Sequence, residues 1–319
     1  MLRITVQFWI CGGLLFGQGP RVSISPTART ERAVDKGSSA KLRVDSNLVL
    51  VPVLVTDHLD RPVLGLQKPN FRVYDDKQEQ QITHFAMEDA PVSVVLVFDK
   101  SGSMGKKLQT SRQAVREFVD VSNPADEFAL VEFADRPQLI QKFSDEKDQI
   151  PNRLAFQDSR GGTALIDAVC LALEQMGRAR HARKAIVLIS DGGDNSSRYR
   201  VGDLRNRIRE ADVQIYSIGV MESISLRGMA PEVFEGATLL DDISKLSGGR
   251  FFQAQHDGSV LDIAKRIGLA LRNEYLLGYS PPTPKQDGRY HRITVKLEPP
   301  EGHKKLRASF RSSYLSQLR

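Results

Sequence analysis

The segment from Val92 to Phe98 constrains the fold of this chain more than any other. Only Ser93 interrupts its apolar run. Apolar residues at successive positions place side chains on both faces of a strand, as in a parallel sheet covered by helices on each side. Lys184 to Ile189 has the same character, and Lys106 to Val121, between the two, has apolar residues at helical spacing. This alternation predicts an α/β fold, a doubly wound and mostly parallel sheet flanked by helices.

The rest of this region continues the alternation of strands and helices. Short helices separate the apolar runs, and glycines such as Gly177 mark where they stop. The further predicted strands are Phe128 to Phe133, Val213 to Val220 and Arg250 to Gln253, and the helices are Thr163 to Met176, Val201 to Glu210, Leu239 to Leu246 and Val260 to Arg272. The α/β domain is expected to span residues 91–275.

Two β-rich segments flank this domain, at residues 46–90 and 276–319. Neither has enough strands to bury a sheet face alone, since three or more strands are needed for a stable sheet. We therefore expect the two flanks to pair into one small β-rich region, with the α/β domain inserted between them. Their predicted strands are Asn47 to Thr56, Phe71 to Tyr74, Gln81 to Phe85, Arg292 to Glu298 and Lys305 to Phe310.

The amino-terminal residues predict export. Residues 1–19 resemble a signal peptide, with Arg3 followed by an apolar stretch from Ile4 to Phe16 that is too short to span a bilayer. Residues 20–45 are rich in small and polar side chains and predict a flexible linker. We expect a periplasmic, cell-surface or secreted protein with no integral membrane span in the mature chain.

Cysteines and charge limit the other possibilities. The chain of 319 residues has two cysteines, Cys11 and Cys170, and removal of the signal peptide would leave only Cys170, predicted to be a buried thiol. The net charge of +6 arises between Thr283 and Arg319, where nine Lys and Arg face three Asp and Glu. These basic residues alternate with apolar ones as on strand faces, and no nucleic-acid motif accompanies them, so we expect no nucleic-acid partner.

Asp99, Ser101 and Ser103 are the residues most informative about function. They follow the buried strand directly, at the end of a strand where open α/β sheets bind ligands. One carboxylate and two hydroxyls at alternate positions can direct three oxygens at one point, and Gly102 allows the tight turn between the serines. Taken alone, the same residues could equally cap the next helix.

Two further loops are placed alike. Thr163 follows two glycines and leads into a helix, and Asp191 follows the second buried strand. If the two strands are neighbours, both residues converge on the Asp99 loop. The set then contains only oxygen ligands, which suit Mg²⁺, Mn²⁺ or Ca²⁺ and argue against zinc or copper. Mg²⁺ prefers six ligands and usually retains water, so a ligand from outside could join.

These three loops resemble a known family. D-K-S-G-S-M, G-G-T-A-L and S-D-G are similar to the metal-ion-dependent adhesion site of von Willebrand factor A-type (VWA) domains, over about Val92 to Asn273. The whole chain further resembles the VWFA-related domain proteins of Acidobacteria, through V-L-V-T-D-H-L-D-R-P-V-L-G-L, F-R-V-Y-D-D-K-Q-E-Q-Q-I, S-G-G-R-F-F and N-E-Y-L-L-G-Y-S-P.

The resemblance implies a role for each residue of the set. Ser101, Ser103 and Thr163 would contact the metal directly, and Asp99 and Asp191 would balance its charge. A carboxylate of a partner protein would complete the shell. Residues beside the metal set are expected to contact that partner, namely Gly102, Met104, Gly162 and Asp194.

We therefore expect a metal-dependent protein-binding or adhesion module and not an enzyme. The chain has no G-x-S-x-G elbow, no H-E-x-x-H helix and no phosphate-binding G-x-x-x-x-G-K loop. Two alternatives stay open. The chain could be a scaffold or assembly protein whose metal site is structural or vacant, or, more distantly, a Mg²⁺-dependent phosphohydrolase.

Overall fold

The computed structural model describes residues 48–87, 89–154, 158–221, 231–281, 287–298, 300 and 305–316. The predicted signal peptide and linker, residues 1–19 and 20–45, lie outside the described residues. Among the helices that are described, none combines the length and apolar character needed to cross a bilayer.

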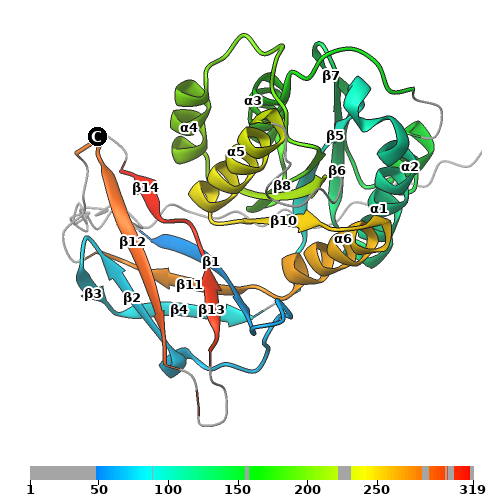
Figure 1. Ribbon diagram of the computed structural model, residues 1–319. Helices are drawn as coiled ribbons and strands as arrows, with labels where there is room; N and C mark the ends of the chain where they lie inside the picture. The colour runs from blue at the N-terminus through cyan, green and yellow to red at the C-terminus, as the bar shows by residue number, and fades with distance from the viewer. Residues whose placement is uncertain are drawn as a thin grey trace, which may run out of the picture. The chain divides into compact units, whose positions relative to one another are not determined.

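A six-stranded sheet forms the centre of the α/β domain (Figure 1). Its order is β10-β9-β8-β5-β6-β7, and all neighbours are parallel except β6 and β7. Every residue of β5, β6 and β9 is buried, as the apolar runs predict. The strands are β5 (Val92–Asp99), β6 (Glu127–Phe133), β7 (Pro137–Ser144), β8 (Arg183–Ser190), β9 (Gln214–Val220) and β10 (Arg250–Ala254).

Helices cover both faces of this sheet and enclose two separate apolar cores. One core packs α1, α2 and α6 against one face, and the other packs α3, α4 and α5 against the opposite face. The predicted doubly wound α/β architecture is therefore confirmed. The helices are α1 (Leu108–Val121), α2 (Gln149–Leu154), α3 (Leu165–Gln175), α4 (Val201–Glu210), α5 (Pro231–Ser247) and α6 (Asp257–Arg272), with short 3-10 turns at Lys68–Asn70, Gly102–Lys107 and Met176–Arg178.

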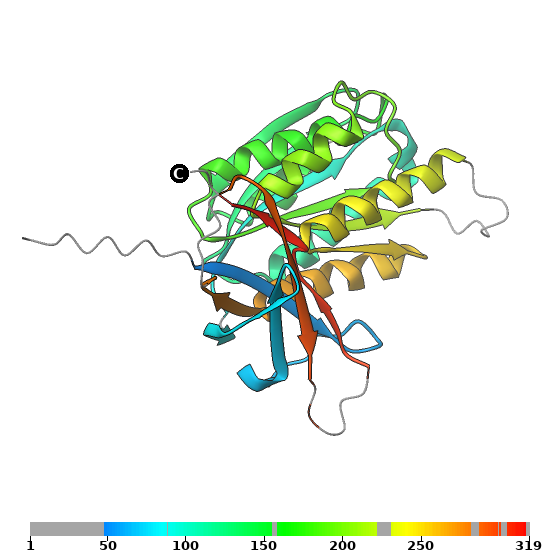
Figure 2. The same cartoon turned by 90° about the vertical axis from the view of Figure 1, so that its left-hand side faces the viewer.

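The flanking segments form two four-stranded sheets around a third core (Figure 2). Their orders are β13-β1-β11-β4 and β14-β12-β2-β3, so each sheet takes strands from both flanks, as the sequence predicts. The Tyr275 hydroxyl donates to the Val63 carbonyl (2.9 Å) and accepts from the Leu66 amide (3.0 Å) inside this core. The strands are β1 (Val49–Thr56), β2 (Phe71–Asp75), β3 (Gln78–Gln80), β4 (Ile82–Met87), β11 (Tyr275–Tyr279), β12 (Tyr290–Leu297), β13 (Arg307–Ser309) and β14 (Ser313–Leu315).

Some elements differ from the sequence prediction. Helix α5 begins at Pro231, not at Leu239, and proline is well suited to the first turn of a helix. The edge strand β7 was not predicted, because most of its residues are only half-buried and irregular pairing with β6 removes the simple alternation of a strand. Cys170 is buried as predicted, and this burial raises the pKa of its thiol to about 11.

Candidate metal-binding site

The three predicted loops meet at the carboxyl edge of the sheet. Strands β5 and β8 are hydrogen-bonded neighbours, so Asp99 at the end of one lies beside Ser190 at the end of the other. The third loop is bonded to the first, since the Gly102 amide donates to the Gly161 carbonyl (3.0 Å). The topology therefore brings together the three loops that the sequence predicts to converge.

Asp99 is fully buried at the base of the site. One carboxylate oxygen accepts the Ser101 amide at 2.8 Å, and the other accepts the Ser190 hydroxyl at 2.5 Å. Burial raises the pKa of Asp99 to about 6, and the nearby charge of Asp191 adds to this shift. Ser190 is not among the predicted site residues, although it stands directly before Asp191. Its hydroxyl also accepts the Gly192 amide (3.0 Å), so it links the two loops.

The two predicted serine ligands lie side by side. Their hydroxyl oxygens are 3.1 Å apart. Ser101 is buried, whereas Gly102 and Ser103 are exposed, so this loop forms part of the solvent-facing rim. A Cβ on Gly102 would lie 3.3 Å from the Gly161 carbonyl oxygen, so glycine fits the close approach of the two loops.

Thr163 and Asp191 are each held by a neighbour outside the predicted ligand set. Thr163 is buried, and its amide donates to the Asn195 side-chain oxygen at 2.8 Å. Asp191 is also buried, and its carboxylate forms an ion pair with Lys107 at 3.2 Å. Lys107 ends the 3-10 turn Gly102–Lys107, which also contains Ser103. The sequence gives no sign of this ion pair, because Lys107 and Asp191 are far apart in the chain and come together only in the folded domain.

The four residues predicted to contact a partner differ in their exposure and in their hydrogen bonds. Gly102 is exposed and Gly162 is half-buried, with the Gly162 amide donating to Asp135 at 2.6 Å. Asp194 accepts the Ile166 amide at 3.1 Å and so helps to cap the start of α3. The prediction for Met104 is wrong, because its side chain is 0% exposed and belongs to an apolar core, so it supports the loop from below.

Helix α5 touches the Asp191 loop through two glycines. Gly192 has a positive φ of 89°, and a Cβ there would lie 2.7 Å from the Gly236 carbonyl carbon. In turn, a Cβ on Gly236 would lie 2.8 Å from Gly192 Cα. Backbone therefore packs directly on backbone beside the site, and neither position has room for a side chain.

A second group of metal-ligating residue types lies in the β-rich region, formed by Asp75, Asp76 and His291. Its atoms are already engaged with one another and with their neighbours. The His291 ring nitrogens lie 2.7 Å from Asp76 and 3.0 Å from Asp287, and Asp75 accepts the Tyr314 hydroxyl at 2.9 Å. This group therefore links strands of the β-rich region.

Comparison with known proteins identifies the central domain. Residues 94–193 match the family description "von Willebrand factor type A domain", and this span contains all three loops. The chain therefore carries a von Willebrand factor type A domain. It is 31% identical to mouse inter alpha-trypsin inhibitor heavy chain 4 over 153 residues, which cover 43% of this chain and 16% of that protein.

Other similarities are more distant. An uncharacterized protein of Borreliella burgdorferi is 26% identical over 206 residues, 56% of this chain and 60% of its own length. Among solved structures, a von Willebrand factor type A protein from Catenulispora acidiphila aligns with a TM-score of 0.49 and 13% identity, over 75% of this chain and 74% of that one.

Proposed function

We propose that this chain is a non-enzymatic, exported protein-binding module that grips an acidic group of a partner protein through a divalent cation. Asp99, Ser101, Ser103, Thr163 and Asp191 would hold the ion. The observation that carries the proposal is the convergence of two buried carboxylates and a pair of hydroxyls at one edge of the sheet.

The chemistry of this set fits Mg²⁺. Neighbouring ligands of an octahedral ion at about 2.05 Å lie roughly 2.9 Å apart, close to the 3.1 Å between the Ser101 and Ser103 hydroxyl oxygens. Seven-coordinate Ca²⁺, with bonds of about 2.4 Å and equatorial ligands roughly 72° apart, would place neighbouring ligands about 2.8 Å apart, so this distance does not separate the ions. We propose Mg²⁺, with Mn²⁺ or Ca²⁺ as alternatives. A divalent charge would also stabilise the ionised form of Asp99, which burial disfavours.

The distribution of exposure supports recognition of a macromolecule. The residues at the base of the site are buried, whereas Gly102 and Ser103 stand at the surface beside them. An ion held here would present an open coordination position toward solvent, where a partner's carboxylate could replace water. The match to the von Willebrand factor type A family supports a protein-interaction module in general terms.

Two alternatives make different predictions. A scaffold with a structural or vacant site would bind its partner equally well in EDTA. A phosphohydrolase would need a general acid or base beside the ion. Of the groups described there besides the predicted ligands, Lys107 is paired with Asp191, and Asp135 accepts the Gly162 amide. Turnover of p-nitrophenyl phosphate by the full chain, lost in Asp99→Asn, would contradict the non-enzymatic proposal.

The test is calorimetric titration of the full chain with Mg²⁺, Mn²⁺ and Ca²⁺. We compare the wild type with Asp99→Asn, with Ser101→Ala/Ser103→Ala, and with Asp120→Asn as a control. Asp120 is an exposed carboxylate on α1, so its variant carries the same charge change outside the site. We expect about one ion per chain in the wild type and control, and loss of binding in both site variants.

Absence of Mg²⁺, Mn²⁺ and Ca²⁺ binding by the wild type would refute the metal-dependent proposal and leave the scaffold alternative. Equal binding by all variants would place the ion elsewhere. Circular dichroism of each variant separates loss of the site from loss of the fold.

A further inference from the structure

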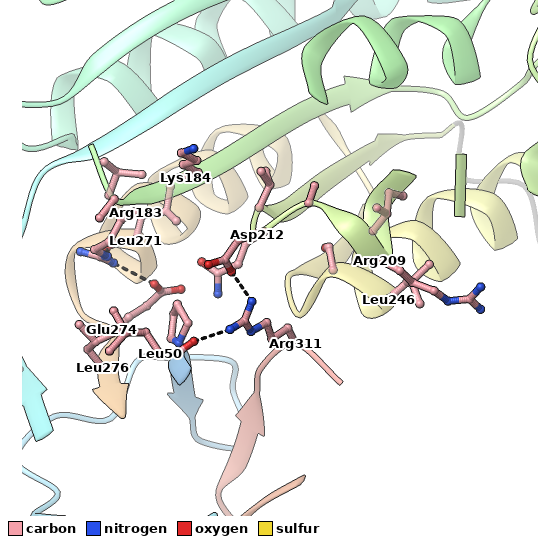
Figure 3. A pocket seen from close by; sticks show the side chains of 18 of the residues that line it. Leu50, Arg183, Lys184, Arg209, Asp212, Leu246, Leu271, Glu274, Leu276 and Arg311 are labelled. Carbon is pink, nitrogen blue, oxygen red and sulfur yellow. Dashed lines mark hydrogen bonds and ion pairs between the residues drawn. The ribbon is translucent and has the colours of Figure 1, made fainter. Parts of the chain in front are cut away.

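A cavity lies at the opposite edge of the sheet from the metal site, between the α/β domain and the β-rich region (Figure 3). Its lining includes Arg183 and Gln214, which begin β8 and β9, and Leu50 of β1. The enclosed volume of the cavity is about 70 Å³, and the space beyond it is open to solvent. The enclosed part has room for a small polar head group, and an apolar tail would lie along the open mouth.

Two buried hydrogen-bond donors belong to the lining of this cavity. Gln214 is buried, with 7% exposure, and its side-chain Nε2 has no acceptor within the part of the chain that the structure describes. The Nε of Arg311 is buried and lacks an acceptor among those residues as well. Buried N–H groups are nearly always hydrogen-bonded, so two such donors in one cavity need acceptor oxygens, which water or a ligand can supply.

The charge of the lining is positive. Both acidic residues are already paired, Glu274 with Arg183 at 2.8 Å and Asp212 with Arg311 at 2.7 Å (Figure 3). Asp212 is 65% exposed and therefore neutralises Arg311 only weakly.

Two further cations lie in the same lining, Lys184 and Arg209, and neither forms an ion pair with a described residue. An anion is therefore favoured over a neutral ligand or a cation. The remaining walls are apolar, from residues of both the α/β domain and the β-rich region, including Leu246, Leu271 and Leu276.

We propose that this cavity binds an amphipathic carboxylate, whose charged head accepts from Gln214 and Arg311 and whose short apolar tail lies against the leucines. The ligand could be a free aliphatic acid or the carboxyl end of a peptide with an apolar last residue. The proposal is independent of the metal site, which lies at the other ends of the same strands.

The experiment measures binding to the full chain in EDTA, so that the metal site contributes nothing. The probes are hexanoate against hexanamide, and N-acetyl-leucine against N-acetyl-leucinamide. Each pair keeps the apolar tail and removes only the charge. We expect saturable binding of at least one acid and much weaker binding of its amide. The acid that binds better identifies the source as a free acid or a peptide end.

A site variant and a matched control test whether the acid binds at Gln214. Gln214→Leu removes one donor and should weaken binding of the acid roughly ten- to a hundred-fold, as loss of a hydrogen bond to a charged group does. The control is Gln141→Leu on β7, a second buried glutamine whose Nε2 also lacks an acceptor among the described residues. Gln141 is not part of the cavity lining, so its variant should bind like the wild type.

Lys184→Met is a second test of the cavity, which remains available if Gln214→Leu does not fold. Lys184 is only half-buried, and the loss of its charge should weaken binding of the acid but not of the amide. Absence of saturable binding of both acids would overturn the proposal. Equal affinity for acid and amide, or unchanged affinity in a folded Gln214→Leu variant, would overturn it as well.

Discussion

The contact between Gly192 and Gly236 leads to a quantitative prediction about Gly236→Ala. A methyl group at Gly236 would lie 2.8 Å from Gly192 Cα and closer still to the Gly192 carbonyl carbon and oxygen. An ordinary carbon–carbon contact is about 3.5 Å, so α5 and the Asp191 loop would have to separate by more than about 0.7 Å. Overpacking of this kind costs about 1–3 kcal/mol. Alanine returns up to about 1 kcal/mol through its higher helix propensity.

The net expectation is a loss of about 0–2 kcal/mol in the free energy of unfolding. Gly202→Ala is the matched control. Gly202 lies in α4, and a Cβ there would meet nothing within 4 Å, so that variant should gain about 0.5–1 kcal/mol. The assay is urea unfolding in EDTA followed by circular dichroism.

The same perturbation should weaken Mn²⁺ binding, because displacement of the loop moves Asp191 relative to Asp99. We expect a loss of about tenfold or more in affinity, the range found when groups that orient metal ligands are altered. Gly202→Ala should bind Mn²⁺ like the wild type. A Gly236→Ala variant that is more stable than the wild type, with unchanged Mn²⁺ affinity, would refute the reasoning about backbone contact.

Three further predictions concern stability, all measured in EDTA. Ser190→Ala removes a hydrogen bond to the buried Asp99 carboxylate and should lower the free energy of unfolding by about 1.5–3 kcal/mol in urea, whereas an unchanged midpoint would contradict this role. The pKa of Asp99 is about 6 in the folded protein against 3.8 for a free carboxyl, so its stabilising contribution is complete below pH 3.8 and is lost as the pH rises through 6. The Tm of the wild type should therefore fall as the pH rises from 3.8 to about 6, and this fall should be smaller in Asp99→Asn. Parallel curves of Tm against pH for the variant and the wild type would contradict this role of Asp99. Arg183→Met leaves the buried Glu274 carboxylate without its ion-pair partner, although the Tyr216 hydroxyl still donates to it, and should cost about 3–5 kcal/mol. Glu274→Gln should restore part of this loss. A double variant no more stable than the single one would exclude an uncompensated charge as the cause.

The fold of the α/β domain was largely predictable because its strands are buried on both faces. Val92 to Phe98 can be a parallel strand covered by helices on each side, and the structure buries all of it. Pairing of the two flanks was predictable for a different reason, since neither could complete a sheet alone. The short strands β3 and β14 were not predictable, because β3 is wholly polar and β14 shows no alternation of polar and apolar residues.

The candidate site was predictable only where its residues are close in sequence or directly follow a clearly predicted strand or glycine pair. Asp99, Ser101 and Ser103 stand in one short loop, and the other loops follow elements that the sequence marks clearly. The ion pair of Lys107 with Asp191 joins residues far apart in sequence, and no local pattern reports it. Burial of Met104 was missed because a residue inside a polar loop can face either solvent or core, and only the packed helix decides. The ligand roles of the five residues stay predictions.

The pairing of the two flanks also has a consequence for the order of folding. Phe71 on β2 pairs with Leu297 on β12, and Val49 on β1 pairs with Tyr279 on β11, so the whole α/β domain lies between the partners. Contacts of such long sequence separation form slowly, because closing a long loop costs entropy before any contact repays it. On a ribosome, the first flank would emerge with its strand edges unpaired and wait for the second. Folding of the intervening domain first would shorten the loop, so the α/β domain would act as the template that brings the two halves of the β-rich region together.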